Sequence, residues 1–247
     1  MHDFIFIIQA RTNSTRMPGK MLKNFYQGKT IPEIIVARLT NNFPNIPIIV
    51  ATTDSVNDDS LVKMLKNKCT IVRGCEDDVL QRFIDVQKHI KSKAVIRVCA
   101  DNPFIDVSFI KELISNWDST LDYLSHRVVN KPVIKTGMGM FCELTTFETL
   151  KKVSSLTSNP YYLEHVTNYI YEHPDVFKLN WIEVEKVFER PDIRLTVDTL
   201  VDFNLTKDIY ENLCKFDVKW GSRDVISYID NGDFLELMNN ENQKNGK

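Results

Sequence analysis

A short loop near the start of the chain gathers three cationic side chains within ten residues. Arg11, Arg16 and Lys20 are separated by hydroxyl, glycine and proline residues in the segment 9–20. Cations of this kind neutralise phosphate oxygens, and hydroxyl and backbone N–H groups donate hydrogen bonds to them. The segment has neither the Walker pattern nor the GxGxxG turn. It predicts a polyphosphate site of another kind, with an ordinary solvated basic loop as the alternative.

Two aspartates stand where short apolar runs end. Asp101 follows the run 94–98, and Asp198 follows the run 194–197. Carboxylates, together with phosphate oxygens and water, are the ligands that Mg²⁺ prefers. The two acids therefore predict a metal–triphosphate site that faces the basic loop. The alternative is that Asp101 belongs to a turn before a helix and that Asp198 caps the helix after it.

Regular elements must bring these residues together. In the first half of the chain, apolar runs at 4–9, 46–51, 70–72 and 94–98 predict strands, and amphipathic stretches at 32–42, 61–65, 77–90 and 107–117 predict helices. Strands that alternate with helices indicate an α/β fold, with a mostly parallel sheet and helices on both faces. Ligands bind at the carboxyl ends of the strands in such a sheet, which is where the basic loop and Asp101 would meet.

The alternation stops at about residue 119. We expect strands at 121–128, 140–144 and 176–184, helices at 147–153, 161–171 and 200–213, and a short strand at 194–197 that rejoins the sheet. This pattern predicts one domain over 1–238 with a small inserted β/α subregion over 119–190. The residues 239–247 are polar and rich in asparagine, so we expect a disordered tail.

Composition excludes several classes of protein. The 31 Lys and Arg residues nearly balance the 33 Asp and Glu residues, which argues against a nucleic-acid partner. No apolar run approaches the roughly 20 residues of a membrane span. The five cysteines are scattered without a CxxC pair, which favours reduced thiols over a zinc site or a disulfide framework. We expect a cytoplasmic protein without a membrane partner.

The basic loop resembles the opening signature of the cytidylyltransferases, which activate 3-deoxy-manno-octulosonate, sialic acids and related compounds as CMP derivatives. The shared spacing is that of Arg11, Ser14, Arg16, Pro18-Gly19-Lys20 and Leu22. The chain is most similar to the branch of the spore coat polysaccharide biosynthesis protein F. It shares patterns with that branch at 74–82, 101–103, 164–167 and 194–199, and the resemblance runs from about residue 4 to 213.

The resemblance implies a three-layer α/β/α nucleotidyltransferase fold (Rossmann-like), CTP as co-substrate, Mg²⁺ as cofactor and a homodimer. The implied reaction transfers CMP from CTP to a small anionic acceptor, a sugar acid or a phosphorylated molecule, for surface polysaccharide biosynthesis, and releases pyrophosphate. By position, it implies catalytic roles for Arg11, Lys20, Asp101 and Asp198, with the two aspartates as metal ligands. It also implies nucleotide contacts from Ala10, Arg11, Ser14, Arg16, Lys20, Arg73 and Asp77.

The second half of the chain is expected to shape the acceptor pocket or a dimer interface. His165, Glu164 and Arg194 are the expected acceptor contacts, with a hydrogen-bonded packing role as the alternative for His165. Arg97 lies inside a predicted strand, so it needs a carboxylate partner, either Asp101 or another acid.

The chain departs from the family pattern at three places. Thr12-Asn13 replaces Met-Gly, Gly139 and Phe141 replace two acids, and Leu163 replaces an arginine. The last two changes predict an acceptor that differs from the usual one. Two other functions stay open: a nucleotidyltransferase that uses another NTP, and a sugar-nucleotide-dependent glycosyltransferase, although the segments 54–55 and 101–103 do not supply the DxD pattern of the latter.

Overall fold

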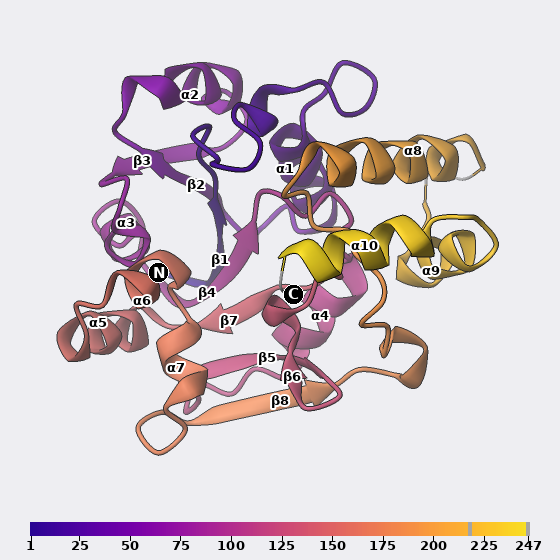
Figure 1. Ribbon diagram of the computed structural model, residues 1–247. Helices are drawn as coiled ribbons and strands as arrows, with labels where there is room; N and C mark the ends of the chain where they lie inside the picture. Colours follow the sequence, from indigo (N-terminus) through magenta and orange to yellow (C-terminus); the bar gives the residue numbers. More distant parts are fainter. Residues whose placement is uncertain (217–218, 246–247) are drawn as a thin grey trace.

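An eight-stranded sheet forms the centre of the molecule (Figure 1). The computed structural model describes residues 1–216 and 219–245. The strands lie in the order β3-β2-β1-β4-β7-β5-β6, with β8 paired to β5 outside this path. Their bounds are β1 His2–Gln9, β2 Ile48–Thr53, β3 Thr70–Gly74, β4 Ser92–Cys99, β5 Tyr123–Val128, β6 Lys131–Pro132, β7 Glu143–Thr145 and β8 Leu179–Glu183.

The first four strands are parallel, and the later ones extend the same sheet. β1 lies between β2 and β4, and β2 pairs with β3, all in parallel. β7 runs antiparallel to β4, and β5 runs antiparallel to β7. The predicted mostly parallel α/β sheet is confirmed. Because β1 to β4 point the same way, the loops after them emerge at one edge.

Helices cover both faces of the sheet, and the side-chain alternation of β1 shows why. Phe6 and Ile8 pack into one hydrophobic core, whereas Ile5 and Ile7 pack into the other. The first core is covered by α1 Ile31–Asn42, α2 Asp59–Leu65, α4 Val107–Ser115, α8 Leu200–Phe216, α9 Ser222–Asp230 and α10 Leu235–Asn245. The second is covered by α3 Val79–Val86, α5 Phe147–Leu156 and α7 Asn168–Glu172. Among the described residues, no helix is both long and apolar enough to cross a membrane.

The single helix predicted over 161–171 is wrong, because the chain breaks at Val166. The structure has α6 Pro160–His165 and then α7, and Val166 between them has φ 49° and ψ −59°. A β-branched residue in this region of backbone space is strained. The break lets the residues on its two sides, His165 and Thr167, face different surroundings.

The strand predicted over 194–197 is also wrong. Leu195 N and Thr196 N both donate to the Gly137 carbonyl, at 2.7 and 3.0 Å, so no strand ladder forms. A Cβ atom at Gly139 would lie 2.9 Å from the Leu195 carbonyl carbon, and Gly139 has φ 61°. The segment 194–197 therefore packs on the backbone of 137–139 rather than joining the sheet.

The disordered tail predicted over 239–247 is wrong where the structure describes it. Residues 239–245 belong to α10, which lies beside α8 and α9 (Figure 1). Glu241 is buried and accepts a hydrogen bond from the Thr199 hydroxyl at 2.9 Å. Two polar side chains of this helix, Glu241 and Asn242, are themselves buried and hydrogen-bonded, so its polar composition does not prevent packing. Residues 246–247 lie outside the described part.

Asp58 anchors the start of the basic loop to the end of β2. Its buried carboxylate accepts five hydrogen bonds, from the backbone N–H and hydroxyl of Thr12, from the Thr52 hydroxyl, and from the backbone N–H and hydroxyl of Thr53. Burial alone would raise the pKa of Asp58, but the hydrogen bonds from Thr12, Thr53 and Thr52 more than offset it, so the pKa is lowered. The loop at Thr12 is held by an ionised acid.

The variant Asp58→Asn tests this anchor. The Asn side chain replaces one acceptor oxygen with an N–H donor, which would face the hydroxyl donors, so we expect a loss of about 2–3 kcal/mol in the free energy of unfolding at pH 7. Since the folded-state pKa of Asp58 is lowered, its contribution is present above the unfolded pKa and is lost as pH falls through the folded pKa. Urea unfolding across the acid range, with the exposed Asp54→Asn as control, measures both effects. Equal stability and equal pH profiles for the two variants would contradict the anchor.

Candidate functional site

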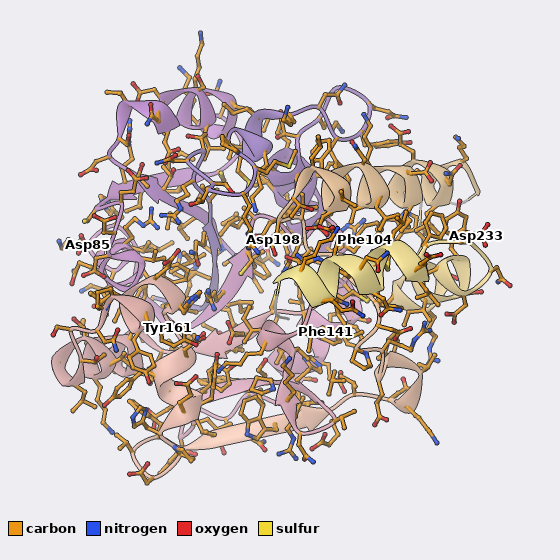
Figure 2. The ribbon with its side chains drawn as sticks, in the orientation of Figure 1. Asp85, Phe104, Phe141, Tyr161, Asp198 and Asp233 are labelled. Atoms are coloured by element: carbon orange, nitrogen blue, oxygen red, sulfur yellow. The ribbon has the colours of Figure 1, made fainter. Side chains whose placement is uncertain are left out.

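A cavity of about 610 Å³ opens at the edge of the sheet where β1 and β4 end. Its lining comes from the basic loop, the end of β4, the segment 131–143, α6 and the segment before α8. Figure 2 labels Asp198, Tyr161 and Phe141, which lie on different sides of it. The cavity therefore joins the parallel half of the sheet to the later, antiparallel half.

The basic loop has a defined backbone shape. The Thr12 carbonyl accepts hydrogen bonds from Ser14 N and Gly19 N, both at 2.9 Å, and Gly19 has φ 71°. The second bond closes the loop, and glycine suits the left-handed conformation at that point. Thr12 is therefore the residue that connects the loop both to itself and to Asp58.

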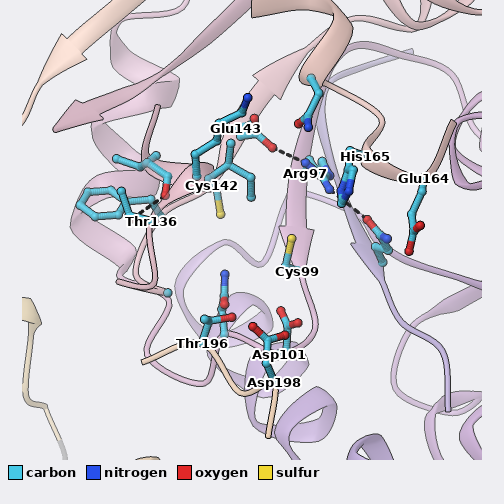
Figure 3. Close-up of a pocket in the computed structure, with 18 of the residues that line it drawn as sticks. Arg97, Cys99, Asp101, Thr136, Cys142, Glu143, Glu164, His165, Thr196 and Asp198 are labelled. Atoms are coloured by element: carbon cyan, nitrogen blue, oxygen red, sulfur yellow. Dashed lines mark hydrogen bonds and ion pairs between the residues drawn. The ribbon is translucent and has the colours of Figure 1, made fainter. Parts of the chain in front are cut away.

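Four of the predicted residues meet at one end of the cavity. Lys20 Nζ lies 2.6 Å from the Val197 carbonyl, 3.2 Å from Asp101 Oδ2 and 3.9 Å from Asp198 Oδ1. Arg16 reaches Asp198 Oδ1 at 2.8 Å and keeps 45% of its side chain exposed. Asp101 and Asp198 lie side by side (Figure 3). The arrangement combines a buried ammonium, an accessible guanidinium and two carboxylates, which suits a phosphate chain with a cation.

Arg194, which the sequence predicted as an acceptor contact, lies outside the cavity lining and binds Asp198. Its side chain is wholly buried, and its guanidinium donates to Asp198 Oδ2 at 3.0 Å and to both oxygens of Asp202 at 2.8 and 3.1 Å. Asp202 also accepts from the backbone N–H of Asp198 and Thr199, each at 2.9 Å. Asp198 is thus oriented by its neighbours on the start of α8.

The donor set at this end fits a hard divalent cation. Asp101 and Asp198 supply carboxylate oxygens, and the buried Asn102 Oδ1, which lines the same cavity, has no hydrogen-bond partner in the described part of the chain. No group of three or more His, Cys, Asp or Glu side chains that could hold a metal ion occurs among the described residues. A small number of protein oxygen donors is sufficient for Mg²⁺, because waters and substrate phosphates supply its other ligands.

A buried ion pair forms another part of the lining. Arg97 and Glu143 are direct partners in the antiparallel register of β4 and β7, and the Arg97 guanidinium lies 2.5 Å from Glu143 Oε2. Thr167 and Tyr123 also donate to the Glu143 carboxylate, and Arg97 donates to Gln9 Oε1 at 3.2 Å. Burial and the Glu143 charge raise the pKa of Tyr123 well above its ordinary value, so it stays a neutral donor.

Sequence reasoning required a carboxylate for Arg97 but did not identify Glu143. The signal was the arginine inside an apolar strand, since a buried guanidinium needs an acid. Several acids were available along the chain, and only the strand register selects Glu143. Figure 3 shows this pair away from Asp101 and Asp198.

The wall opposite β4 comes from α6. Glu164 Oε1 lies 3.1 Å from the Arg11 guanidinium, and both side chains are partly exposed. The His165 ring lies 4.8 Å from the Tyr161 ring and lines the cavity, as does Asn168 beyond the break at Val166. Lys131 and Lys135 approach from the segment after β5. His165 and Glu164, the expected acceptor contacts, therefore line the cavity, and so do Tyr161 and Asn168, which carried no recognisable signal in the sequence.

Three further predicted residues lie outside the lining. Ala10 is buried, and its backbone N–H donates to the Ala51 carbonyl at 3.3 Å. Arg73 fastens the end of β3 to the segment after β2 through the Thr53 and Ser55 carbonyls and Asp59. Asp77 is exposed. Ser14 and Arg11, by contrast, line the cavity.

Comparisons with known proteins agree with this architecture. A family model described as "Cytidylyltransferase" matches residues 5–220. The spore coat polysaccharide biosynthesis protein SpsF of Bacillus subtilis is 33% identical over 218 residues, which covers 85% of this chain and 88% of that protein. A solved cytidylyltransferase from Leptospira borgpetersenii is 25% identical, with a TM-score of 0.83 over 97% of this chain and 98% of that one. A CMP:2-keto-3-deoxy-manno-octonic acid synthetase complexed with CTP shares the fold, at 16% identity and a TM-score of 0.63 over 85% of this chain and 99% of that one.

The variant Arg97→Met tests the buried pair. It leaves the Glu143 charge without its cation, so we expect a loss of about 3–5 kcal/mol in the free energy of unfolding. The double variant R97M/E143Q removes the uncompensated charge and should recover a large part of that loss. A double-mutant cycle measured by urea unfolding gives the coupling. Additive losses in the two single variants would show that the pair does not act as a unit.

Proposed function

Because the chain belongs to the cytidylyltransferase family, we propose that it transfers CMP from CTP to a small anionic acceptor and releases pyrophosphate. The observation that supports this most is the convergence of Arg16, Lys20, Asp101 and Asp198 at one end of the cavity. A polyanion binds where cationic side chains can contact it. A triphosphate carries several negative charges, so it needs more than one such side chain. The near-neutral net charge of the chain is no obstacle, since the cations are concentrated in one loop.

The basic loop binds the phosphates in this proposal. Arg16 is exposed enough to face a phosphate while it keeps its contact with Asp198, and Arg11 and Ser14 line the same cavity. Lys20 is buried and held by three oxygen atoms, so its charge has a fixed position. Fixed charges stabilise a transition state better than mobile ones, because they need no reorganisation during the reaction.

The reaction requires little covalent chemistry from the protein. An oxygen of the acceptor forms a new bond to the α-phosphorus of CTP, and the bond from that phosphorus to the bridging oxygen breaks, so the electron pair leaves with pyrophosphate. Lys20 and Arg16 stabilise the charge that develops on the leaving group. Alignment and charge neutralisation therefore supply the catalysis.

Asp101 and Asp198 would hold a divalent cation, with the Asn102 amide oxygen as a further donor. We propose Mg²⁺ on the basis of the oxygen-only donor set. When bound, it would neutralise part of the charge on the phosphates. Arg194 and Asp202 keep the Asp198 carboxylate in position for this role.

The acceptor occupies the side of the cavity that β7, α6 and the segment after β5 enclose. Lys131, Lys135 and His165 line it and suit an anion, such as a sugar acid or a phosphorylated small molecule. Gly139 and Phe141 also line this side and carry no charge. The name of the Bacillus subtilis relative supports a product used in surface polysaccharide biosynthesis.

An NTP panel tests the nucleotide. We expect CTP, among the four NTPs with Mg²⁺, to bind most tightly in calorimetry and to release pyrophosphate when a panel of sugar acids and small phosphorylated acceptors is supplied. Tighter binding of ATP or UTP than of CTP would overturn the cytidylyl assignment. Turnover with a sugar nucleotide and no pyrophosphate release would instead indicate a glycosyltransferase.

The variant Asp101→Asn tests the proposed role of Asp101 as a metal ligand. Loss of one of the two charges that hold the cation is expected to lower kcat by at least about 10³-fold, while the melting temperature stays near that of the native chain. The exposed Asp175→Asn serves as the matched control and should keep full activity. Unchanged turnover in D101N would remove Asp101 from the proposed metal site.

A further inference from the structure

The helix α10 packs against the residues that hold Asp198. It lies beside α8 (Figure 1), and the family model, which matches residues 5–220, does not reach it. Its buried face carries Met238, which is wholly buried, and Glu241 and Asn242, which are 4% and 9% exposed. Glutamate and asparagine side chains are rarely buried to this extent unless they have partners that need them.

Asn242 completes the contacts of the Arg194 guanidinium. The Nε atom of Arg194 donates to Asp202, and its Nη2 atom donates to both Asp202 and Asp198. The remaining nitrogen, Nη1, donates to Asn242 Oδ1 at 3.4 Å. A guanidinium with a partner on each nitrogen cannot turn without losing one of them. The helix α10 therefore helps to fix the plane of the group that orients Asp198.

The same helix holds the backbone that leads into Arg194. Asn242 Nδ2 donates to the carbonyls of Pro191 and Asp192 at 3.3 and 3.4 Å. The backbone N–H of Arg194 donates to Met238 Sδ at 3.4 Å. The main chain on the N-terminal side of the arginine is therefore attached to α10 as well.

Glu241 holds the chain on the other side of Asp198. The hydroxyl of the next residue, Thr199, donates to Glu241 Oε2 at 2.9 Å. The same hydroxyl accepts from the Asp202 N–H at 3.1 Å, so it joins α10 to the first turn of α8. Lys244 lies 3.2 Å from Glu241 Oε1 and supplies a cation for this buried carboxylate.

The two oxygen atoms of Asp198 have different surroundings. Oδ2 accepts from Arg194, whereas Oδ1 lies 2.8 Å from the Arg16 guanidinium and 3.9 Å from Lys20 Nζ. Asp198 lines the cavity, but Arg194 and the residues of α10 do not. The contacts from α10 therefore reach Asp198 on the side away from the cavity and leave Oδ1 directed toward it.

We propose that Glu241 and Asn242 are positioning residues, which hold Asp198 through Thr199 and Arg194 in the orientation in which it binds the divalent cation. This inference rests on the proposed function. Residues that contact a metal ligand set the affinity for the metal, because they fix the direction in which the ligand oxygen points. The helix α10 is then a part of the site as well as a cover for the hydrophobic core.

The variant Asn242→Leu tests this role, because it removes the amide and keeps a similar volume. CTP affinity is measured by calorimetry with Mg²⁺ and again with EDTA, and the ratio of the two affinities gives the contribution of the cation. We expect Asn242→Leu to lower this ratio about 10-fold or more and to lower kcat about 10- to 100-fold. CTP affinity in EDTA should stay within about 3-fold of the native value, because the basic loop is unchanged.

Two variants of Glu241 test the same role through Thr199. Glu241→Leu removes the acceptor of the Thr199 hydroxyl and should lower the Mg²⁺ ratio as Asn242→Leu does. Glu241→Gln keeps an amide oxygen that accepts from the hydroxyl and should keep a ratio near the native one. A contact that only stabilises the fold would change the melting temperature of the ligand-free variants and leave the ratio unchanged.

The control is Asn240→Leu, which changes an exposed residue of the same helix and should behave as the native chain does. A lower melting temperature of N242L with a native Mg²⁺ ratio and a native kcat would overturn the inference. If N242L does not fold, equal ratios in E241L and E241Q would overturn it. If the native chain binds no CTP, or binds it equally in Mg²⁺ and EDTA, the proposed function fails together with this inference; if N242L and E241L share a large native ratio, only the inference fails.

Discussion

The ammonium of Lys20 is the contact on which the site depends. It joins the basic loop to Asp101 at the end of β4 and to Val197 and Asp198 before α8, segments that are far apart in the sequence. Two carboxylates this close to one another would repel, and the buried charge between them offsets that repulsion. The same charge, being fixed, is available to a polyanion that enters the cavity.

Two further carboxylates, which lie outside the cavity, hold the residues that make this contact. Asp58 holds the beginning of the basic loop through Thr12, and Asp202 holds Asp198 through Arg194 and through backbone N–H groups. Neither acid lines the cavity. Each is buried and accepts several hydrogen bonds, so the positions of the basic loop and of Asp198 are set by carboxylates whose own hydrogen-bonding capacity is already used.

The three buried arginines differ in whether an acid within the fold compensates their charge. Arg97 and Arg194 are neutralised within the fold and contribute to its shape. Arg82 has no partner among the described residues, although a neutral residue would fill the same place.

From the amino-acid sequence alone one can predict the class of fold and the meeting of the basic loop with Asp101 at one end of the cavity. Apolar runs that alternate with helices require a parallel sheet, and residues after parallel strands must meet at one edge, so Arg16, Lys20 and Asp101 were predictable as neighbours. The partner of Arg97 depends on the fold, because the register of β4 and β7 selects Glu143 from many acids. The fold also places Arg194 beside Asp198 and residues 239–245 in a helix, and it buries Arg82 without a hydrogen-bond partner among the described residues. Local patterns encode which face of an element is apolar, whereas pairing between distant polar side chains depends on register and packing, which no local pattern contains.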